Sequence, residues 1–154
     1  MKITFCELKP DNLAPFCDLY LRVFNAAPWH DGWHIDAVCE RFATFSQFPR
    51  FYGLGMLADD VPVGLAFGWG ERWIEGWHFF IKEFCIDSQL QGQGLGKQLF
   101  AEYERRLHAQ GYRWTFLNTA RAVPAYHFYR KIGFLEEDQT ILTKQLTSPA
   151  AMLA

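Results

Sequence analysis

The chain has 154 residues, of which 50% are hydrophobic and 18% aromatic, and a formal net charge of −2. This length fits one domain with its own core, and the apolar content argues against disorder because enough surface is buried to offset the entropy of ordering. A nearly neutral chain is not a typical nucleic-acid binder, which is usually basic. No apolar run approaches the roughly 20 residues of a membrane-spanning helix. We therefore expect neither nucleic acid nor membrane as a partner.

The cysteines and the N-terminus indicate a cytoplasmic protein. Charges at Glu7 and Lys9 interrupt any signal-peptide apolar region. Widely spaced cysteines without a C-x-x-C pair are typical of reduced core residues. There are four of them: Cys6, Cys17, Cys39 and Cys85.

The first half of the chain predicts strands and two helices. Residues 3–8 are expected to form a strand, and apolar residues at intervals of three and four then predict helices over 13–24 and 35–45. Strands are expected over 51–57 and 63–69, followed by a loop over 70–76. The almost continuously apolar stretch 77–86 predicts a central strand buried on both faces.

The second half predicts a glycine turn and two further helices. A helix begins near Leu95 and ends at Gly111, where a left-handed conformation is expected. A strand over 114–117 and a helix beginning at Pro124 follow, and 134–146 is expected to supply one or two closing strands. The order predicts an α+β mixed sheet covered by helices, with one domain over 1–146 and a short tail over 147–154.

The turn that joins strand 77–86 to the next helix is expected to bind an anion. Its sequence is Gln91-Gly92-Gln93-Gly94-Leu95-Gly96. Glycine lets the backbone approach a ligand closely, and the first amides of a helix are unpaired at the positive end of its dipole. Neither a P-loop nor a G-x-G-x-x-G fingerprint fits, because Gln98 and Lys97 stand where those motifs require Ser/Thr and Gly. The alternative is a plain tight turn.

Two motifs carry a family resemblance. Gln91, Gly94 and Gly96, with Glu83-Phe84-Cys85-Ile86-Asp87 before them, resemble the central motif of the GCN5-related N-acetyltransferase (GNAT) superfamily. The segment from Pro124 to Phe134 is similar to that superfamily's second motif, A-x-x-F-Y-x-x-x-G-F. One departure is Ala122, where many members have Asn; Asn118 and Thr119 are candidates to replace its contacts.

The resemblance implies an acyl-CoA N-acyltransferase fold, with a mostly antiparallel, twisted central sheet flanked by about four helices, and acetyl-CoA as co-substrate. The backbone of Phe84, Cys85 and Ile86 would pair with the pantetheine arm. The cofactor would also contact Asn118, Tyr126 and Tyr129. The pyrophosphate would lie on the amides of Gln91, Gly92, Gln93, Gly94, Leu95, Gly96 and Lys97.

Two residues are candidates for proton transfer. Glu83 is a carboxylate in an apolar strand, where burial raises a carboxyl pKa towards values useful in a base. Lys82 is expected on the opposite sheet face. The alternative is that Glu83 pairs with a buried cation. The resemblance places Tyr129 as the general acid, with Tyr126 in reserve; the alternative for Tyr129 is a core aromatic. Cys85 is expected in the core.

The acceptor site is expected at tryptophan-rich loops. Trp29, Trp33 and Trp73, with Glu83, are the candidate substrate-binding residues. The tryptophans have an alternative role in a core or in the face of a homodimer. No metal site is expected, because His30 and His34 lack a third ligand.

The resemblance predicts an N-acetyltransferase acting on a primary amine of a small molecule or peptide by direct attack. Two alternatives stay open: a non-catalytic acyl-CoA-binding module, and a protein lysine or N-terminal acetyltransferase.

Overall fold

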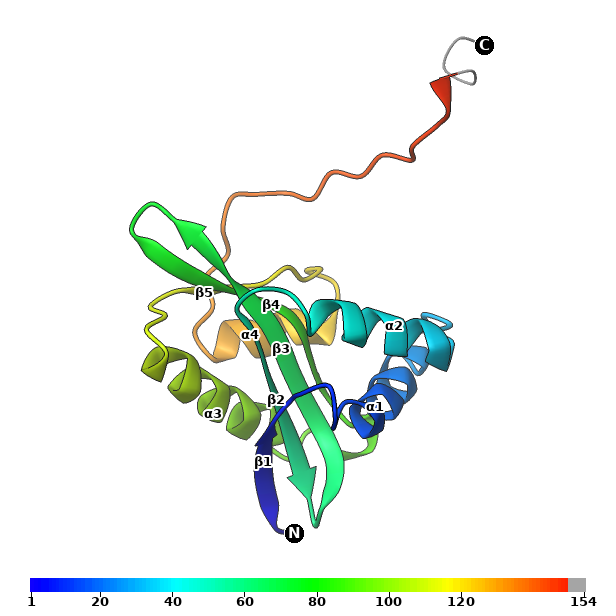
Figure 1. The fold of residues 1–154 in the computed structure, drawn as a ribbon. Coiled ribbons are helices and arrows are strands. Elements are labelled where there is room, and N and C mark those ends of the chain that lie inside the picture. Colours follow the sequence, from blue (N-terminus) through cyan, green and yellow to red (C-terminus); the bar gives the residue numbers. More distant parts are fainter. Residues whose placement is uncertain (150–154) are drawn as a thin grey trace.

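A five-stranded mixed sheet forms the centre of the computed structural model, which describes residues 1–149, and helices cover both of its faces (Figure 1). Strands β1 to β5 lie side by side in chain order; the first four are antiparallel and β5 is parallel to β4. This arrangement confirms the predicted fold class. The strands are β1 (Ile3–Glu7), β2 (Phe51–Ala58), β3 (Val61–Trp73), β4 (Gly76–Ile86) and β5 (Thr115–Phe116). The helices are α1 (Ala14–Asn25), α2 (Ile35–Phe45), a 3-10 turn η1 (Ser88–Leu90), α3 (Leu95–Ala109) and α4 (Pro124–Lys131).

Two hydrophobic cores lie on opposite faces of the sheet. Helix α3 packs Leu99 and Tyr103 against Phe79 of β4 on one face. Helices α1 and α2 cover the other face, where Phe42 meets Phe67 of β3 in an edge-to-face contact at 5.0 Å. The helical spacing of the apolar residues predicted these helices correctly, because each buries one stripe against the sheet. Gly111 takes the left-handed conformation expected of it, at φ +100°.

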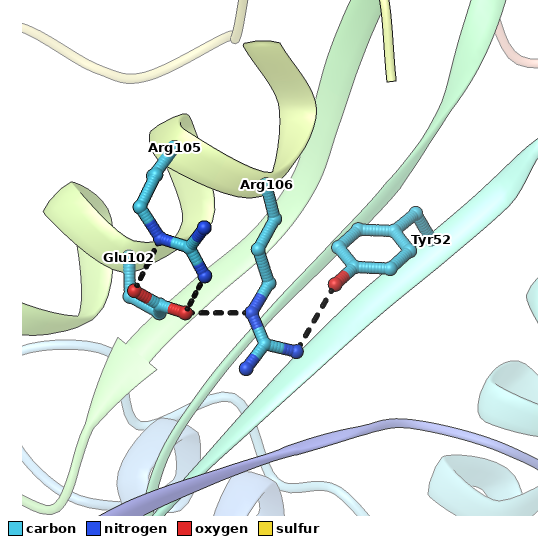
Figure 2. Close-up of polar contacts among 4 residues, drawn as sticks. All are labelled: Tyr52, Glu102, Arg105 and Arg106. Carbon is cyan, nitrogen blue, oxygen red and sulfur yellow. Dashed lines mark hydrogen bonds and ion pairs between the residues drawn. The ribbon is translucent and has the colours of Figure 1, made fainter. Parts of the chain in front are cut away.

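A polar network joins α3 to β2 (Figure 2). Glu102 accepts hydrogen bonds from Arg105 at 2.6 Å and from Arg106 at 2.8 Å. Arg106 in turn donates to the Tyr52 hydroxyl at 3.4 Å. The hydrogen bonds from Arg105 and Arg106 lower the pKa of Glu102 to about 2. This carboxylate therefore stays ionised, and Arg106 links it to Tyr52 of β2.

The prediction of a loop over 70–76 was wrong. Strand β3 continues to Trp73 and β4 begins at Gly76, so the two strands form a long hairpin whose tip projects beyond the rest of the sheet (Figure 1). Cross-strand contacts extend the ladder, since the Trp73 and His78 rings stack at 5.3 Å.

The closing strands expected over 134–146 are also absent from the described chain, because residues 135–148 form no helix or strand. Phe134 packs on Phe100 at 5.3 Å, Arg121 pairs with Glu136, and from there the chain runs outward (Figure 1). The expectation of four core cysteines was wrong for Cys39, which is exposed on α2. None of the helices within residues 1–149 is long and apolar enough to cross a membrane.

Candidate active site

The glycine turn lies between β4 and the first turn of α3. Gly92 and Gly94 have φ of +81° and +80°, a conformation that L side chains rarely adopt, and open space surrounds both. Gly96 has a different role, because a side chain there would meet the Phe128 ring of α4 at 3.3 Å. The first backbone hydrogen bond of α3 runs from Gln98 to Gly94, which leaves the amides of the preceding helical residues directed out of the N-terminus. These amides leave room for the predicted anion, and the anion site itself stays a prediction.

Strand β4 has a free edge beside this turn. It pairs with β5 only at Phe79 and Phe80, so residues 81–86 have no strand partner on that side in the described chain. Gln91 closes the turn by donating its side-chain amide to the Ile86 carbonyl at 3.1 Å. The edge of a strand carries unpaired N–H and C=O groups. The remaining backbone groups of this segment are therefore available to an extended ligand.

A bulge in β4 changes which face its side chains take. Phe67 of β3 lies opposite Glu83 but the next residue, Gly68, lies opposite Ile81, so Lys82 is the extra residue. Strands β3 and β4 approach each other closely here, since a Cβ on Gly68 would lie 1.8 Å from the Phe80 carbonyl oxygen. Lys82 and Glu83 both face α2 as a result: the Lys82 ammonium lies 5.9 Å from the Phe45 ring centroid, and Glu83 contacts Arg41. The expectation that Lys82 and Glu83 point to opposite faces was wrong.

Glu83 is 9% exposed and has two partners from the helices above it. Arg41 of α2 donates to its carboxylate from Nη2 at 2.5 Å and from Nε at 3.2 Å, and the Tyr20 hydroxyl of α1 donates at 3.2 Å. Burial raises the pKa of Glu83, and the hydrogen bonds from Arg41 oppose part of that rise. The alternative of a buried cation is therefore present in the structure, alongside the raised pKa that a base requires.

Glu83 and Tyr129 line the same cavity, whose volume is about 390 Å³. Tyr129 packs its ring edge-on to Phe84 at 6.1 Å, and burial raises the pKa of its hydroxyl. The cavity lies between β4, the loop after β5 and α4, beside the free edge of β4. Its walls are formed by Phe24, Trp29, Lys82, Glu83, Phe84, Asn118, Thr119, Ala120, Ala125, Tyr129 and Ile141.

Several predicted site residues lie elsewhere. Trp33 lines a separate cavity of about 260 Å³ along α2, where Arg41 lies over its ring at 5.5 Å. Trp73 is at the tip of the β3–β4 hairpin, outside the residues that line the larger cavity. Tyr126 is not among those residues either, and its hydroxyl donates to Glu136 at 3.3 Å. Cys85 is buried in the core under α1, as expected.

Sequence reasoning missed Arg41 and Tyr20, the two partners of Glu83. A signal for Arg41 was present, because it falls between Val38 and Phe45 on the apolar stripe of α2, where a cation requires a buried partner. Tyr20 likewise sits among the inward positions of α1, and a buried hydroxyl needs a hydrogen-bond partner. The identity of that shared partner was not readable, because Glu83 is 42 residues from Arg41 and 63 from Tyr20.

Comparison with known proteins identifies the family. Residues 13–134 match the model of the acetyltransferase (GNAT) family. The chain belongs to this family. The family match confirms the resemblance drawn from the two sequence motifs. Among curated proteins none matches the chain.

Solved structures similar to this GNAT chain show the same fold at low identity. An aminoglycoside acetyltransferase, meta-AAC0020 from an uncultured soil metagenomic sample, crystallised with sisomicin, is 19% identical with a TM-score of 0.76, over 95% of this chain and 97% of its own. The aminoglycoside N-acetyltransferase AAC(6')-Iy in complex with CoA is 17% identical with a TM-score of 0.76, over 94% and 95%. The V. cholerae integron cassette protein VCH_CASS6 is 13% identical with a TM-score of 0.79, over 99% and 98%.

Proposed function

We propose that this chain is an acetyl-CoA-dependent N-acetyltransferase that acetylates a primary amine by direct attack, with Glu83 as base and Tyr129 as acid. One observation carries the proposal: both residues line one cavity at the free edge of β4, the strand that leads along the chain into the glycine turn and α3. A base and an acid on opposite sides of a reacting centre are what acyl transfer to an amine requires.

The cofactor fits the glycine turn and the free edge. The pyrophosphate of acetyl-CoA would lie on the amides of Gln91 to Lys97, where the helix dipole favours an anion. The pantetheine arm would pair with the backbone of Phe84 to Ile86, since no strand occupies that edge in the described chain. Two of the similar structures support CoA as the cofactor, because AAC(6')-Iy is in complex with CoA in one and with a CoA bisubstrate analogue in the other.

The proton transfers follow from the two candidate side chains. An alkylammonium with a pKa near 10 must lose a proton before it attacks. Glu83 would accept that proton, directly or through a water molecule, and the amine nitrogen would then form a bond to the thioester carbonyl carbon. A backbone amide near Ile86 would stabilise the oxyanion. As the C–S bond breaks, Tyr129 would donate its proton to the departing thiolate, and the second proton that the nitrogen loses on becoming an amide would restore the Tyr129 hydroxyl. Its raised pKa keeps the hydroxyl protonated until that step.

The charges around the cavity bear on the acceptor. Two charged side chains line it within the described chain, Lys82 and Glu83, and Arg41 already neutralises Glu83. Lys82 makes no ion pair with a described residue, so the cavity presents a net positive charge. Phe24 and Trp29 add aromatic walls. These features favour a single amine attached to a neutral or anionic remainder, because Lys82 repels a polycation.

The test is thiol release from acetyl-CoA across amino acids, monoamines, polyamines, aminoglycosides and peptides. Glu83→Gln and Tyr129→Phe are each expected to lower kcat by about 10²–10⁴-fold, the usual contribution of a positioned acid or base. CoA affinity, measured by calorimetry, is expected to stay within a few-fold of wild type. The matched control is Tyr126→Phe, which removes a hydroxyl one turn away and outside the cavity. Unchanged turnover in both variants would refute the catalytic assignments.

A second candidate has support from the Arg41–Glu83 ion pair, because a carboxylate held by an arginine also suits a purely structural role. In that case the chain is an acyl-CoA-binding module. It would gain thermal stability from CoA and release no thiol with any amine. Glu83→Gln would then lower only its stability.

A further inference from the structure

Three donors reach the buried carboxylate of Glu83, and all of them end on the same oxygen. Arg41 donates to Oε1 from Nη2 at 2.5 Å and from Nε at 3.2 Å, and the Tyr20 hydroxyl donates to this same atom at 3.2 Å. A carboxylate oxygen has about two lone-pair sites, so three donors leave Oε1 no place for a further hydrogen. Any proton that Glu83 takes must therefore bind Oε2.

The second oxygen, Oε2, is the one that meets the cavity. It receives no hydrogen bond from residues 1–149, since the three donors all bond Oε1. Within the same residues no fully buried side-chain oxygen or nitrogen lacks a partner, so Oε2 is not fully buried. Glu83 lines the larger cavity, together with Tyr129, and does not line the smaller one. The open side of Oε2 therefore faces the space that it shares with Tyr129.

The guanidinium of Arg41 is oriented to serve one oxygen. An arginine that neutralises a carboxylate frequently forms two parallel hydrogen bonds, one to each oxygen. Here Nε and Nη2 converge on Oε1 instead. Two rings support this orientation, because the guanidinium carbon lies 5.5 Å from the ring centroid of Trp33 and 4.9 Å from that of Phe45. The ion pair thus leaves Oε2 open, which a purely structural pair has no reason to do.

Tyr20 holds the same oxygen from α1. Its ring packs edge-on against Phe42 of α2 at 5.3 Å and against Trp33 at 5.8 Å, and these contacts fix the position of the hydroxyl. The terminal torsion of a glutamate is broad and roughly two-fold, so an unheld carboxylate exchanges its two oxygens by rotation. Donors from two helices oppose that exchange and keep Oε2 on the cavity side.

We propose that Arg41 and Tyr20 are positioning residues, which hold Oε1 of Glu83 so that Oε2 takes the proton of the acceptor amine. The proposal rests on the function proposed above, in which Glu83 is the base. In this step an N–H bond of the ammonium breaks, the electron pair stays on the nitrogen, and an O–H bond forms at Oε2, directly or through a water molecule. Oε1 becomes the carbonyl oxygen of the neutral acid and keeps its donors. The proton passes from Oε2 to solvent once the product has left.

Tyr20→Phe and Arg41→Lys test the positioning role in the thiol-release assay, with the acceptor of fastest turnover in the panel above. Tyr20→Phe removes one donor and keeps the ring, while Arg41→Lys keeps the charge but lacks the two-donor fork. Each is expected to lower kcat by about 10–10²-fold, because a misplacement of about 1 Å can cost about 10²-fold. KM for the acceptor and CoA affinity in calorimetry should stay within a few-fold of wild type. Tyr52→Phe is the matched control, since the Tyr52 hydroxyl also bonds an arginine but lies outside the cavity lining.

The pH profile and a double variant separate positioning from a loss of stability. Burial raises the pKa of Glu83, and the hydrogen bonds from Arg41 and Tyr20, with the charge of Lys82, oppose part of that rise. Loss of the Tyr20 donor should raise this pKa further and move the acid limb of kcat/KM to higher pH, whereas Tyr52→Phe should leave the limb in place. Because Tyr20 acts through Glu83, Tyr20→Phe should lower turnover no further in the Glu83→Gln background.

The outcomes distinguish the positioning role from the proposed function. Full turnover in Glu83→Gln would overturn the proposed base, and this inference with it. A slow Glu83→Gln beside Tyr20→Phe and Arg41→Lys variants that keep the wild-type kcat and pH profile would overturn the positioning role alone. The same follows if Tyr20→Phe lowers turnover equally in the wild-type and Glu83→Gln backgrounds, because Tyr20 would then act independently of Glu83.

Discussion

Removal of the Arg41 side chain tests the buried ion pair that holds Glu83. In Arg41→Met the methionine keeps part of the packing on Trp33 and Phe45, whose ring centroids lie 5.5 and 4.9 Å from the guanidinium carbon, but leaves the carboxylate without its cation. A buried charge stripped of its partner costs about 3–5 kcal/mol. Protonation limits that cost. A carboxyl of ordinary pKa, about 4.3, needs about 3.7 kcal/mol to take a proton at pH 7.

Protonation of Glu83 at pH 7 costs less free energy than that of an ordinary carboxyl, because burial already raises its pKa. We therefore expect Arg41→Met to lose about 2–3 kcal/mol of unfolding free energy at pH 7. The loss should depend on pH. A carboxyl whose pKa is higher in the folded than in the unfolded protein binds its proton more tightly when folded, so folding is favoured as pH falls. Arg41→Met raises that pKa further. The difference from wild type should thus grow from pH 5 to pH 8 and shrink towards the ordinary glutamate pKa.

Urea unfolding at several pH values between 5 and 8 measures this difference. Arg105→Met is the matched control, since Arg105 also bonds a carboxylate but is 66% exposed, and surface pairs contribute about 0–1 kcal/mol. Adding Glu83→Gln to Arg41→Met should restore most of the lost stability at pH 8, because no buried charge then remains. A loss independent of pH, or one that the second substitution leaves unchanged, would refute the reasoning.

Three further predictions concern the turn, the cavity and the bulge. Gly94→Ala places a side chain at φ +80°, which is expected to cost about 1–2 kcal/mol of stability in urea unfolding and to weaken CoA binding in calorimetry; unchanged CoA affinity would contradict the anion site. Lys82→Gln should lower KM for polyamines and raise it for amines that carry a carboxylate, while Lys82→Arg should keep the wild-type order in the thiol-release assay. Gly68→Ala drives a methyl group to 1.8 Å from the Phe80 carbonyl oxygen, so we expect a melting temperature at least several degrees lower, whereas a tolerated alanine would mean that the bulge is not as close as described.

Local sequence signals predicted most of the elements. The spacing of Leu99 and Tyr103 predicted the inner face of α3, because a helix buries residues three and four apart whatever its surroundings. The left-handed conformation of Gly111 followed from residue type and its place at the end of the helix. Residue type did not predict where the β3–β4 hairpin ends, since the extension of β3 to Trp73 depends on cross-strand contacts such as the stacking of Trp73 on His78.

Some predictions could not be confirmed by fold and family alone. The family could be predicted because two contiguous motifs are present in the sequence, the glycine turn with the strand residues before it and the segment from Pro124 to Phe134. The family match over residues 13–134 confirmed that prediction. The roles of Glu83 and Tyr129 stay predictions, supported by their shared cavity. The substrate role predicted for Trp33 and Trp73 has no such support, because neither lines that cavity. The positions of Trp33 and Trp73 depend on how the loops and the hairpin pack, and residue type alone does not determine that packing.

The sequence by itself determined the glycine turn and the helix that begins there, because both depend on contacts between residues close in the chain. It also determined the family, because each motif is a continuous stretch of sequence. The tertiary structure decided the surroundings of Glu83. A single extra residue, Lys82, turns Glu83 towards α2, since the side-chain period of a strand is two and one insertion changes the face. Arg41 and Tyr20 then reach it from helices far away in the sequence. The chemistry available at this carboxylate thus arises from packing that no local pattern records.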